Sequence, residues 1–268
     1  MKEITSKDNP DLKRIRQLES RKYREKYGQF LIEGPVALEE ALKENAALSL
    51  VLCSRRFYEE SRGAVLIKAL EKAGVSVCLA EQGLFEGLSF VENPQGILAA
   101  AEKPRWKRED LFLPGQNLLV LDRIADPGNL GTMLRTCEAA GFGGAVCLKG
   151  TADPYNPKTA RAAAGALLRL PLITMEGPEE LKAFCEEKGK RLVCTGPRES
   201  LPYYRARLDR DVALVIGNEA GGVCRELMEG AWKRVSIPME GRGESLNAAV
   251  AAAILMFEAL RQKQQKQG

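Results

Sequence analysis

Short apolar segments alternate with segments of helical pattern along this chain of 268 residues, and the alternation constrains its fold more than any other feature. In the second half of the chain, the apolar runs predict strands at 117–122, 145–148, 170–173, 191–194, 212–216 and 234–237. The segments between them predict helices near 129–140, 157–168, 178–188 and 245–261. Short strands separated by helices indicate a parallel sheet that is covered on both faces.

The first 101 residues show the same alternation on a smaller scale. Strands are expected at 30–32, 48–52, 75–79 and 96–100, with helices at 35–43 and 64–72, which together indicate a small α/β domain. The polar segment 102–116 contains two prolines and a glycine and is typical of a linker. We therefore expect an N-terminal domain over 1–101 and a C-terminal domain over 117–268.

Histidine is absent from the sequence, which excludes several classes of active site. A Ser-His-Asp triad, a Cys-His pair, an imidazole general base and the usual mixed zinc sites are all excluded. Any chemistry must therefore use arginine, lysine, carboxylates, hydroxyls, asparagine, cysteine, tyrosine or a cofactor. We expect no metal site.

Cysteine usage and the N-terminal segment suggest a cytoplasmic protein. The seven cysteines are irregularly spaced and none forms a C-x-x-C pair, as is typical of reduced thiols in an intracellular protein. The N-terminal segment lacks the apolar core of a signal peptide, and the apolar run at 248–257 is too short to span a bilayer. We expect no association with membranes.

A basic segment near the N-terminus is the main candidate for contact with nucleic acid. The first 101 residues have no net charge, but residues 13–26 hold seven basic and only two acidic side chains, with Tyr23, Tyr27 and Phe30 in or beside them. Cations next to aromatic rings suit RNA phosphates and stacked bases, although a solvated helix face has the same composition. The candidate RNA-contacting residues are Lys13, Arg14, Arg21, Lys22 and Arg24.

Three loops that follow predicted strands carry the candidate chemistry, because ligands bind at the carboxyl ends of the strands in parallel sheets. The first loop turns at Asp126-Pro127-Gly128 and leads into a helix expected from Asn129. Gly131 permits close approach of a ligand, and Arg135 lies one turn further along the helix. A tight turn followed by a surface arginine would account for the same residues without a function.

The second loop follows the strand at 212–216 and surrounds Glu219 with glycines at 217, 221 and 222. Its backbone could present N–H and C=O groups to a ligand, and an arginine would be the natural partner of Glu219. No G-x-G-x-x-G sequence and no Gly-Lys-Ser/Thr sequence occurs in these loops, which argues against a dinucleotide-dependent dehydrogenase and a P-loop.

The third loop leads into the alanine-rich helix expected at 245–261. Ser245 is a good N-cap for this helix, and Asn247 falls in its first turn. Capping alone would explain Ser245. The alanines make a narrow helix surface that permits close packing against the sheet or a partner helix.

Taken together, the three loops resemble the SpoU/TrmH family of SPOUT-class RNA ribose 2′-O-methyltransferases. The first loop matches the motif N-x-G-x-x-x-R…G at Asn129, Gly131, Arg135 and Gly141; the second matches G-x-E-x-x-G at Gly217, Glu219 and Gly222; and the third matches I-P-M…S-L-N at Ile237, Pro238, Met239, Ser245, Leu246 and Asn247. The likeness covers roughly 117–262. Segments 32–42 and 93–99 less specifically resemble the family's accessory RNA-binding domain.

The resemblance implies a fold and a cofactor that composition could not indicate. The C-terminal domain would be a parallel-sheet SPOUT domain with a trefoil knot, would form a homodimer, and would hold S-adenosylmethionine in the knot loops. By motif position, the residues that contact the cofactor would be Gly217, Ile237 and Leu246. Thr195 and Gly196, at the exit of another predicted strand, are added as candidates without support from a motif.

The resemblance also implies the catalytic residues, namely Arg135, Asn129, Glu219, Ser245 and Asn247. The expected reaction is in-line attack of a ribose 2′-oxygen on the methyl group of the sulfonium. A free guanidinium is a poor base, so Arg135 would either pass a proton through an adjacent RNA phosphate or only clamp that phosphate. The sequence leaves both alternatives open.

The separate N-terminal domain favours ribosomal RNA as the substrate, by analogy with compact tRNA-specific relatives that lack such a domain. The alternatives are a tRNA ribose 2′-O-methyltransferase and an inactive RNA-binding factor in ribosome assembly. The presence of all five candidate catalytic residues argues against the inactive factor.

Overall fold

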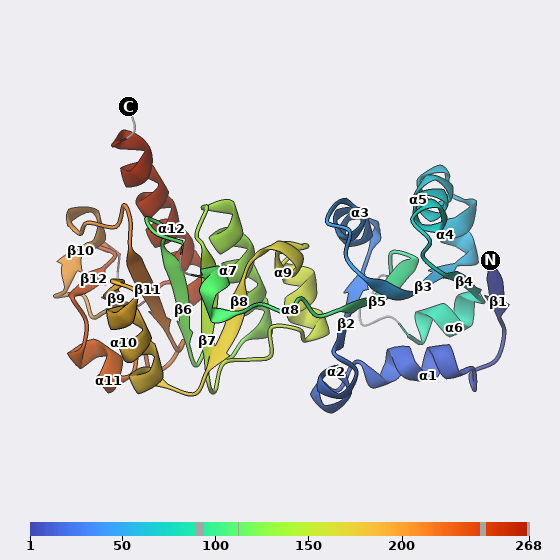
Figure 1. Ribbon diagram of the computed structural model, residues 1–268, viewed down its shortest axis with the longest axis horizontal. Coiled ribbons are helices and arrows are strands. Elements are labelled where there is room, and N and C mark those ends of the chain that lie inside the picture. Colours follow the sequence, from blue (N-terminus) through green and yellow to red (C-terminus); the bar gives the residue numbers. More distant parts are fainter. Residues whose placement is uncertain (89–93, 112, 242–244, 267–268) are drawn as a thin grey trace. The chain divides into compact units, whose positions relative to one another are not determined.

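The computed structural model describes residues 1–88, 94–111, 113–241 and 245–266 (Figure 1). The chain forms two compact units. The first comprises residues 1–104 together with 153–168, and the second comprises 105–152 and 169–268. Asn93, which belongs to the segment resembling an RNA-binding domain, lies outside the described residues.

The second unit is built on a seven-stranded parallel sheet, as the sequence predicts. The strand order is β10-β12-β9-β11-β6-β7-β8. The strands are β6 (Leu118–Asp122), β7 (Gly144–Leu148), β8 (Leu172–Met175), β9 (Arg191–Thr195), β10 (Leu201–Pro202), β11 (Val212–Gly217) and β12 (Lys233–Ser236). Every neighbouring pair is parallel. The two-residue strand β10 was not expected from the sequence.

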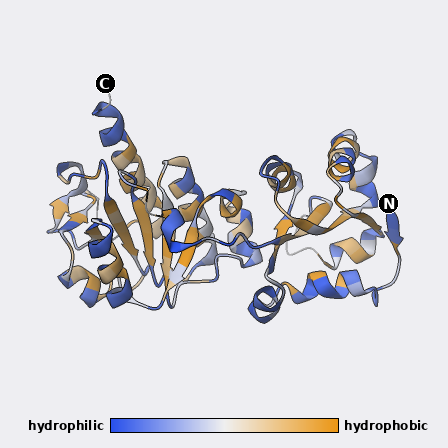
Figure 2. Cartoon of the chain, in the orientation of Figure 1, coloured by the Kyte–Doolittle hydropathy of each residue, from blue (hydrophilic) through white to orange (hydrophobic). Residues whose placement is uncertain are grey.

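Helices cover both faces of this sheet. Alternate strand residues such as Leu118 and Val120 pack in one cluster with Leu181 and Phe184 of α10 (Pro178–Glu187), a helix that lies beside α11 (Arg225–Glu229). The intervening residues are equally buried and point to the opposite face, where α7 (Pro127–Ala139) and α12 (Ala248–Gln265) pack against each other. Figure 2 shows the hydrophobic strands between helices that contain both hydrophobic and hydrophilic residues.

The order of the strands departs from their order in the chain at one edge of the sheet. β12 lies between β9 and β10, although β9 and β10 both precede it in sequence. The connection 196–211 therefore passes from β9 to the far side of β12 and then returns to β11. The last strand of the sheet to be made thus lies between two strands that precede it in the chain.

The prediction of a single helix over 157–168 is wrong, because the structure has two shorter helices there. They are α8 (Pro157–Ala162) and α9 (Ala166–Arg169). Ala164 and Gly165 lie between them with positive φ values of 46° and 87°, which interrupts the right-handed helix. Apolar periodicity does not reveal such a break.

The first unit has a five-stranded mixed sheet, of order β1-β4-β3-β5-β2. Its strands are β1 (Lys2–Ile4), β2 (Gln29–Glu33), β3 (Leu48–Ser54), β4 (Val77–Ala80) and β5 (Ile97–Glu102), of which β5 is antiparallel to both its neighbours. Its helices are α1 (Pro10–Gln17), α2 (Arg21–Tyr27), α3 (Pro35–Lys43), α4 (Arg55–Glu59), α5 (Ser61–Lys72) and α6 (Gln82–Glu86), together with α8 from the segment 153–168, which contacts β2. The side chains of Leu12, Ile15 and Leu18 pack on one face of this sheet. Among the residues that the structure describes, no helix is both long and apolar enough to cross a membrane.

Candidate functional site

Glu219, in the loop after β11, connects that loop to the one that follows β6. Its carboxylate accepts hydrogen bonds from the backbone N–H groups of Ala125 and Asp126, at 3.2 and 3.4 Å, and from Nδ2 of Asn129 at 3.1 Å. Asp126 holds the same loop from its other side, because its carboxylate caps α7 by accepting from the N–H of Asn129 at 2.8 Å. The two loops are thus fixed to each other.

Asn247 adds the third loop to this cluster. Its Nδ2 donates to Oδ1 of Asn129 at 3.0 Å, while its own Oδ1 accepts from the N–H groups of Ala249 and Val250. Asn247 is therefore the N-cap of α12, and the expectation that Ser245 has this role is wrong. The helix begins three residues later than predicted because the Asn247 side chain already satisfies its first free N–H groups. Asn129, Glu219 and Asn247 form one network, named here the Asn129 network.

The hydrogen bonds keep Glu219 ionised. Partial burial alone would raise the pKa of its carboxyl group, but the bonds from Asn129 and from the backbone N–H groups outweigh burial and lower this pKa. At neutral pH the network therefore contains a carboxylate that can only accept hydrogen bonds. The Asn129 amide is consequently oriented with its nitrogen toward Glu219 and its oxygen toward Asn247.

The loop that carries Glu219 is tightly closed on itself. A Cβ atom on Gly217 would lie 2.1 Å from backbone atoms of Gly222 and Val223, so only glycine fits there. Asn218 Nδ2 donates to the carbonyl of Arg123 at 2.8 Å, and its Oδ1 accepts from the N–H groups of residues 220 and 221. Asn218 was not predicted to be a site residue, although its position directly after Gly217, in a glycine-rich loop, was a signal in the sequence.

Asp122, at the end of β6, holds the same loop in place. It was not predicted to be a site residue either. Its buried carboxylate accepts from the N–H of Cys224 at 2.7 Å and from Nε of Arg123 at 2.8 Å. Arg123 also donates to the carbonyl of Gly222. An aspartate that ends a wholly apolar strand was the signal in the sequence, since a buried carboxylate requires partners.

A cavity of about 770 Å³ opens beside this loop, at the carboxyl ends of β9, β11 and β12. All five residues predicted to contact the cofactor line it, namely Thr195, Gly196, Gly217, Ile237 and Leu246. Glu219 and Ser245 line it as well, together with apolar side chains that include Val235, Met239 and Leu255. Its volume suits a small-molecule cofactor, and its lining combines accessible backbone with apolar side chains. No group of three or more acidic or cysteine side chains that could hold a metal occurs among the described residues.

The structure does not bring Arg135 into the Asn129 network or into the lining of the cavity, as far as the described residues extend. Arg135 is exposed on α7, six residues after Asn129. Six residues correspond to about 600° of helix rotation, so the two side chains point about 120° apart around the helix axis. Within its own chain, the Arg135 side chain therefore points away from that of Asn129.

Four of the five predicted RNA-contacting residues of the first unit lie at its surface. Arg14 and Lys22 lie over the rings of Tyr27 and Tyr23, at 5.5 and 5.8 Å from the ring centroids, and these two rings stack on each other. Lys13 and Arg21 are exposed and form only surface ion pairs. These four side chains remain compatible with RNA contact and equally with a solvated helix face.

The prediction that Arg24 contacts RNA is wrong. Its side chain is only 2% exposed, and its Nη2 lies 2.6 Å from the carboxylate of Asp153. Its Nη1 donates to the carbonyls of Leu18 and Glu19. A guanidinium whose donors are used inside the fold cannot contact RNA, so this residue ties α2 to the segment 153–168 within the first unit.

Comparison with known proteins gives one consistent result. Residues 116–257 match the model of the SpoU rRNA Methylase family, and residues 9–99 match an MRM3-like substrate binding domain. The chain is 35% identical over 260 residues to the 23S rRNA (guanosine(2553)-2′-O)-methyltransferase RlmP of Bacillus subtilis, covering 96% of this chain and 98% of that protein. It is 34% identical over 211 residues to the 23S rRNA (guanosine-2′-O-)-methyltransferase RlmB of Escherichia coli, covering 76% and 87%. An AdoMet-bound rRNA methyltransferase from Sinorhizobium meliloti has a similar structure, with a TM-score of 0.84, 30% identity and 97% coverage of both chains.

Proposed function

Because the chain belongs to the SpoU rRNA methylase family, we propose that the cavity of the second unit binds S-adenosylmethionine and that the Asn129 network receives the ribose of the substrate. The protein is an rRNA ribose 2′-O-methyltransferase that depends on S-adenosylmethionine. The observation that carries the proposal is that three separate loops meet beside one cavity, at the carboxyl ends of parallel strands. Both relatives named above act on guanosine in 23S rRNA, so we propose a 23S rRNA guanosine as the substrate.

The cavity has the composition that an adenosine-containing cofactor requires. When bound, S-adenosylmethionine supplies a methyl group that is already activated on a sulfonium. Gly217, Ile237 and Leu246 would hold it largely through backbone groups, and Thr195 and Gly196 would flank its adenosine. Gly217 has a second role, because the absence of a Cβ lets the Glu219 loop close against the strand end.

The Asn129 network would position the acceptor. Glu219 fixes one end of the Asn129 amide and Asn247 fixes the other, so the amide cannot rotate when RNA arrives. A preset polar group of this kind holds a hydroxyl in line with the methyl group and lowers the entropic cost of reaching the transition state. Ser245, exposed at the mouth of the cavity, would add a hydroxyl for the ribose or its phosphate.

Arg135 requires a second protomer in this proposal. It is exposed on α7, and the neighbouring helix α12 exposes Val250 and Phe257, each 49% accessible and seven residues apart on one face. We place the homodimer interface on this α7–α12 surface, because large apolar side chains on one helix face suit burial against a copy of themselves. Arg135 would then reach the RNA phosphate at the partner subunit's cavity, as a clamp or as a path for the proton of the 2′-hydroxyl.

We also propose that the second unit is knotted. The support is the position of β12 between β9 and β10, because the connection 196–211 has to pass β12 to reach β10 and pass it again to reach β11. The first unit would bind rRNA through Lys13, Arg14, Arg21 and Lys22. Residues 1–101 would form the substrate-binding domain, 102–116 a linker, and 117–268 the methyltransferase domain, whose segment 153–168 packs with the first unit. All seven cysteines are free thiols, in keeping with action in the cytoplasm.

The test is methyl transfer from radiolabelled S-adenosylmethionine to unmodified 23S rRNA and, separately, to tRNA. We expect label in 23S rRNA at one guanosine ribose, with none in tRNA. Label confined to tRNA would contradict the choice of substrate. If neither RNA were labelled while the protein still bound 23S rRNA, it would be an inactive assembly factor.

A further inference from the structure

The second unit carries a basic groove that the proposed reaction does not use. It lies between α12 and the segment that follows β10, and has a volume of about 420 Å³. The residues that line it, named here the Tyr204 groove, are Tyr204, Arg205, Ala206, Arg207, Arg261, Gln262, Gln265 and Lys266. Most of these side chains are cations or amides, and one is an aromatic ring.

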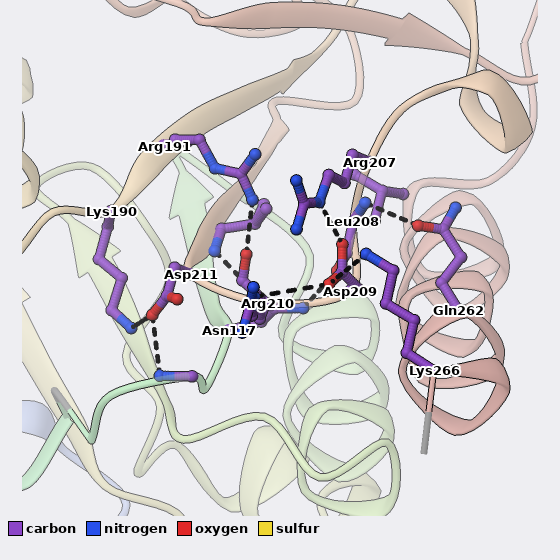
Figure 3. A network of polar contacts seen from close by, with 12 residues as sticks. Asn117, Lys190, Arg191, Arg207, Leu208, Asp209, Arg210, Asp211, Gln262 and Lys266 are labelled. Carbon is purple, nitrogen blue, oxygen red and sulfur yellow. Dashed lines mark hydrogen bonds and ion pairs between the residues drawn. The ribbon is translucent and has the colours of Figure 1, made fainter. Parts of the chain in front are cut away.

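The charges of this groove are arranged with cations outside and carboxylates inside. Asp209 is only 3% exposed, yet three cations surround it: Arg207 at 3.0 Å, Lys266 at 2.9 Å and Arg210 at 3.8 Å. Figure 3 shows these three side chains gathered around Asp209. Each cation is at least half exposed, so one buried carboxylate holds three charges at the surface.

Arg261 and Arg205 extend the positive surface. Arg261 forms two hydrogen bonds with Glu258, whose side chain is only 9% exposed. Arg205 is exposed and pairs with no carboxylate among the residues that the structure describes. The net potential over the groove is therefore positive, which favours a polyanion.

The groove is held in shape by Gln262. Its Oε1 accepts from the N–H of Leu208 at 2.8 Å (Figure 3). Its Nε2 donates to the carbonyl of Ala206 at 3.0 Å. The segment that carries Tyr204 and Arg205 is thus fixed to α12. Tyr204 is 51% exposed and forms a T-shaped contact with the neighbouring Tyr203 ring, so about half of its surface is available to another planar group.

We propose that the Tyr204 groove binds RNA that flanks the modified nucleotide, with Arg205, Arg207 and Lys266 on phosphates and Tyr204 stacked on a base. A positive groove with an exposed aromatic ring is the combination that binds nucleic acid independently of sequence. The groove cannot hold the reacting ribose, because Ala248 lines the cavity whereas Arg261 lines the groove, and 13 residues of α12 separate them by about 20 Å. This inference rests on the proposed function, since it assumes an RNA substrate.

The test uses the full-length protein and unmodified 23S rRNA, with the dissociation constant measured by filter binding between 50 and 200 mM KCl. We expect Arg205→Gln to reduce the slope of log K against log salt by roughly 0.7 to 0.9, the value for one lost phosphate contact. Tyr204→Ala should weaken binding by about fivefold or more, because it removes a stacked base. Neither residue contacts Asp209, so both variants should fold normally.

The control variant is Arg108→Gln, which removes an exposed arginine that lies over the Phe184 ring on the α10 side of the sheet. It should leave the salt slope unchanged. In steady-state methylation of 23S rRNA, the two groove variants should raise KM for RNA, with kcat and S-adenosylmethionine affinity unchanged.

The failures of this inference and of the proposed function can be separated. If the wild-type protein methylates 23S rRNA but the groove variants keep its salt slope and KM, the groove does not bind RNA. The same conclusion follows if the variants impair methylation of ribosomal particles but not of naked rRNA, because the groove would then bind a protein. If the wild-type protein methylates no RNA, the proposed function itself is wrong.

Discussion

Asn129 Nδ2 donates a hydrogen bond of 3.1 Å to the carboxylate of Glu219, across 90 residues of sequence. This bond joins the loops after β6 and β11, and the bond from Asn247 joins both to the start of α12. An amide held from both ends needs no reorganisation when substrate binds. The expected effect of this network on catalysis can be measured separately from its effect on stability.

Asn247 allows that separation, because its two amide atoms have different partners. Asn247→Ser keeps a hydroxyl to cap α12 but loses the donor to Asn129, whereas Asn247→Ala loses both. We expect both variants to lower kcat, by about 100-fold, as the acceptor is no longer held in line. Only Asn247→Ala should lose about 1 kcal/mol of unfolding free energy, measured by urea denaturation. Wild-type kcat in Asn247→Ser would show that the contact with Asn129 is irrelevant to catalysis.

Gly217 is expected to be intolerant of any side chain. Gly217→Ala would place a Cβ 2.1 Å from backbone atoms of the Glu219 loop, which must then move out of its position beside the cavity. We expect loss of S-adenosylmethionine binding by calorimetry. Gly221→Ala in the same loop is the matched control, because its Cβ would meet only Oδ1 of Asn218 at an ordinary 3.8 Å. Equal affinity in both variants would rule out this account of the loop.

Arg135 should act across the proposed dimer interface. Arg135→Ala and Glu219→Ala homodimers should both be inactive. In a mixed dimer of the two variants, one site combines an intact cavity with an intact arginine from the partner, so about half of the wild-type activity should return. Doubly tagged mixed dimers, purified in two affinity steps, would be assayed for methyl transfer. If they stay inactive, Arg135 serves the cavity of its own chain or only the fold.

Arg24 and Arg21 lie three residues apart but should behave oppositely. Arg24→Ala leaves the carboxylate of Asp153 buried without its partner and should cost about 3–5 kcal/mol of unfolding free energy. Arg21→Ala, at a side chain 68% exposed, should change stability by less than about 0.5 kcal/mol. The RNA-binding proposal instead predicts that Arg21→Ala reduces the salt slope of rRNA binding. A stable Arg24→Ala protein with weakened RNA binding would reverse this assignment.

The buried cysteines should resist alkylation at ordinary pH. Burial raises the pKa of Cys53, Cys185 and Cys194 to about 12, so the thiolate fraction of each at pH 8 is on the order of 10⁻⁴. Because a raised pKa favours the thiol, reactivity in the native protein should appear only as pH approaches 12. Mass spectrometry after iodoacetamide treatment at pH 8 should find these three unlabelled, and labelled once guanidinium unfolds the chain. Labelling of the native protein at pH 8 would contradict the burial.

The sequence predicts much of the methyltransferase domain because its strands are continuous apolar runs and its motifs lie at their exits. Six of the strands in the second unit lie within a few residues of their predicted positions. Two predictions about helix boundaries were wrong, because each boundary depends on one local feature of the chain. The boundary at Asn247 and the break at Ala164 depend on which backbone groups find a local partner, and hydrophobic patterning carries no information about that.

Arg24 shows a second limit of sequence analysis. The composition of 13–26 predicts that all of its cations lie on an RNA-binding surface, but the Arg24 side chain is buried. Its partner, Asp153, lies 129 residues away, in a segment that follows β7 of the other unit. Only the folded chain shows that pairing. Conversely, the likeness to a known family located the Asn129 network although no local pattern connects its three members.

The position of β12 between two strands that precede it also governs when this protein can become active. During synthesis, β9, β10 and β11 are made before β12, the strand that lies between β9 and β10 in the folded sheet. Ser236, Ile237 and Leu246, which line the cavity, arrive only with or after that strand. The proposed cofactor site is therefore complete only after β12 and the start of α12 have been made, so a shorter chain lacks part of its lining.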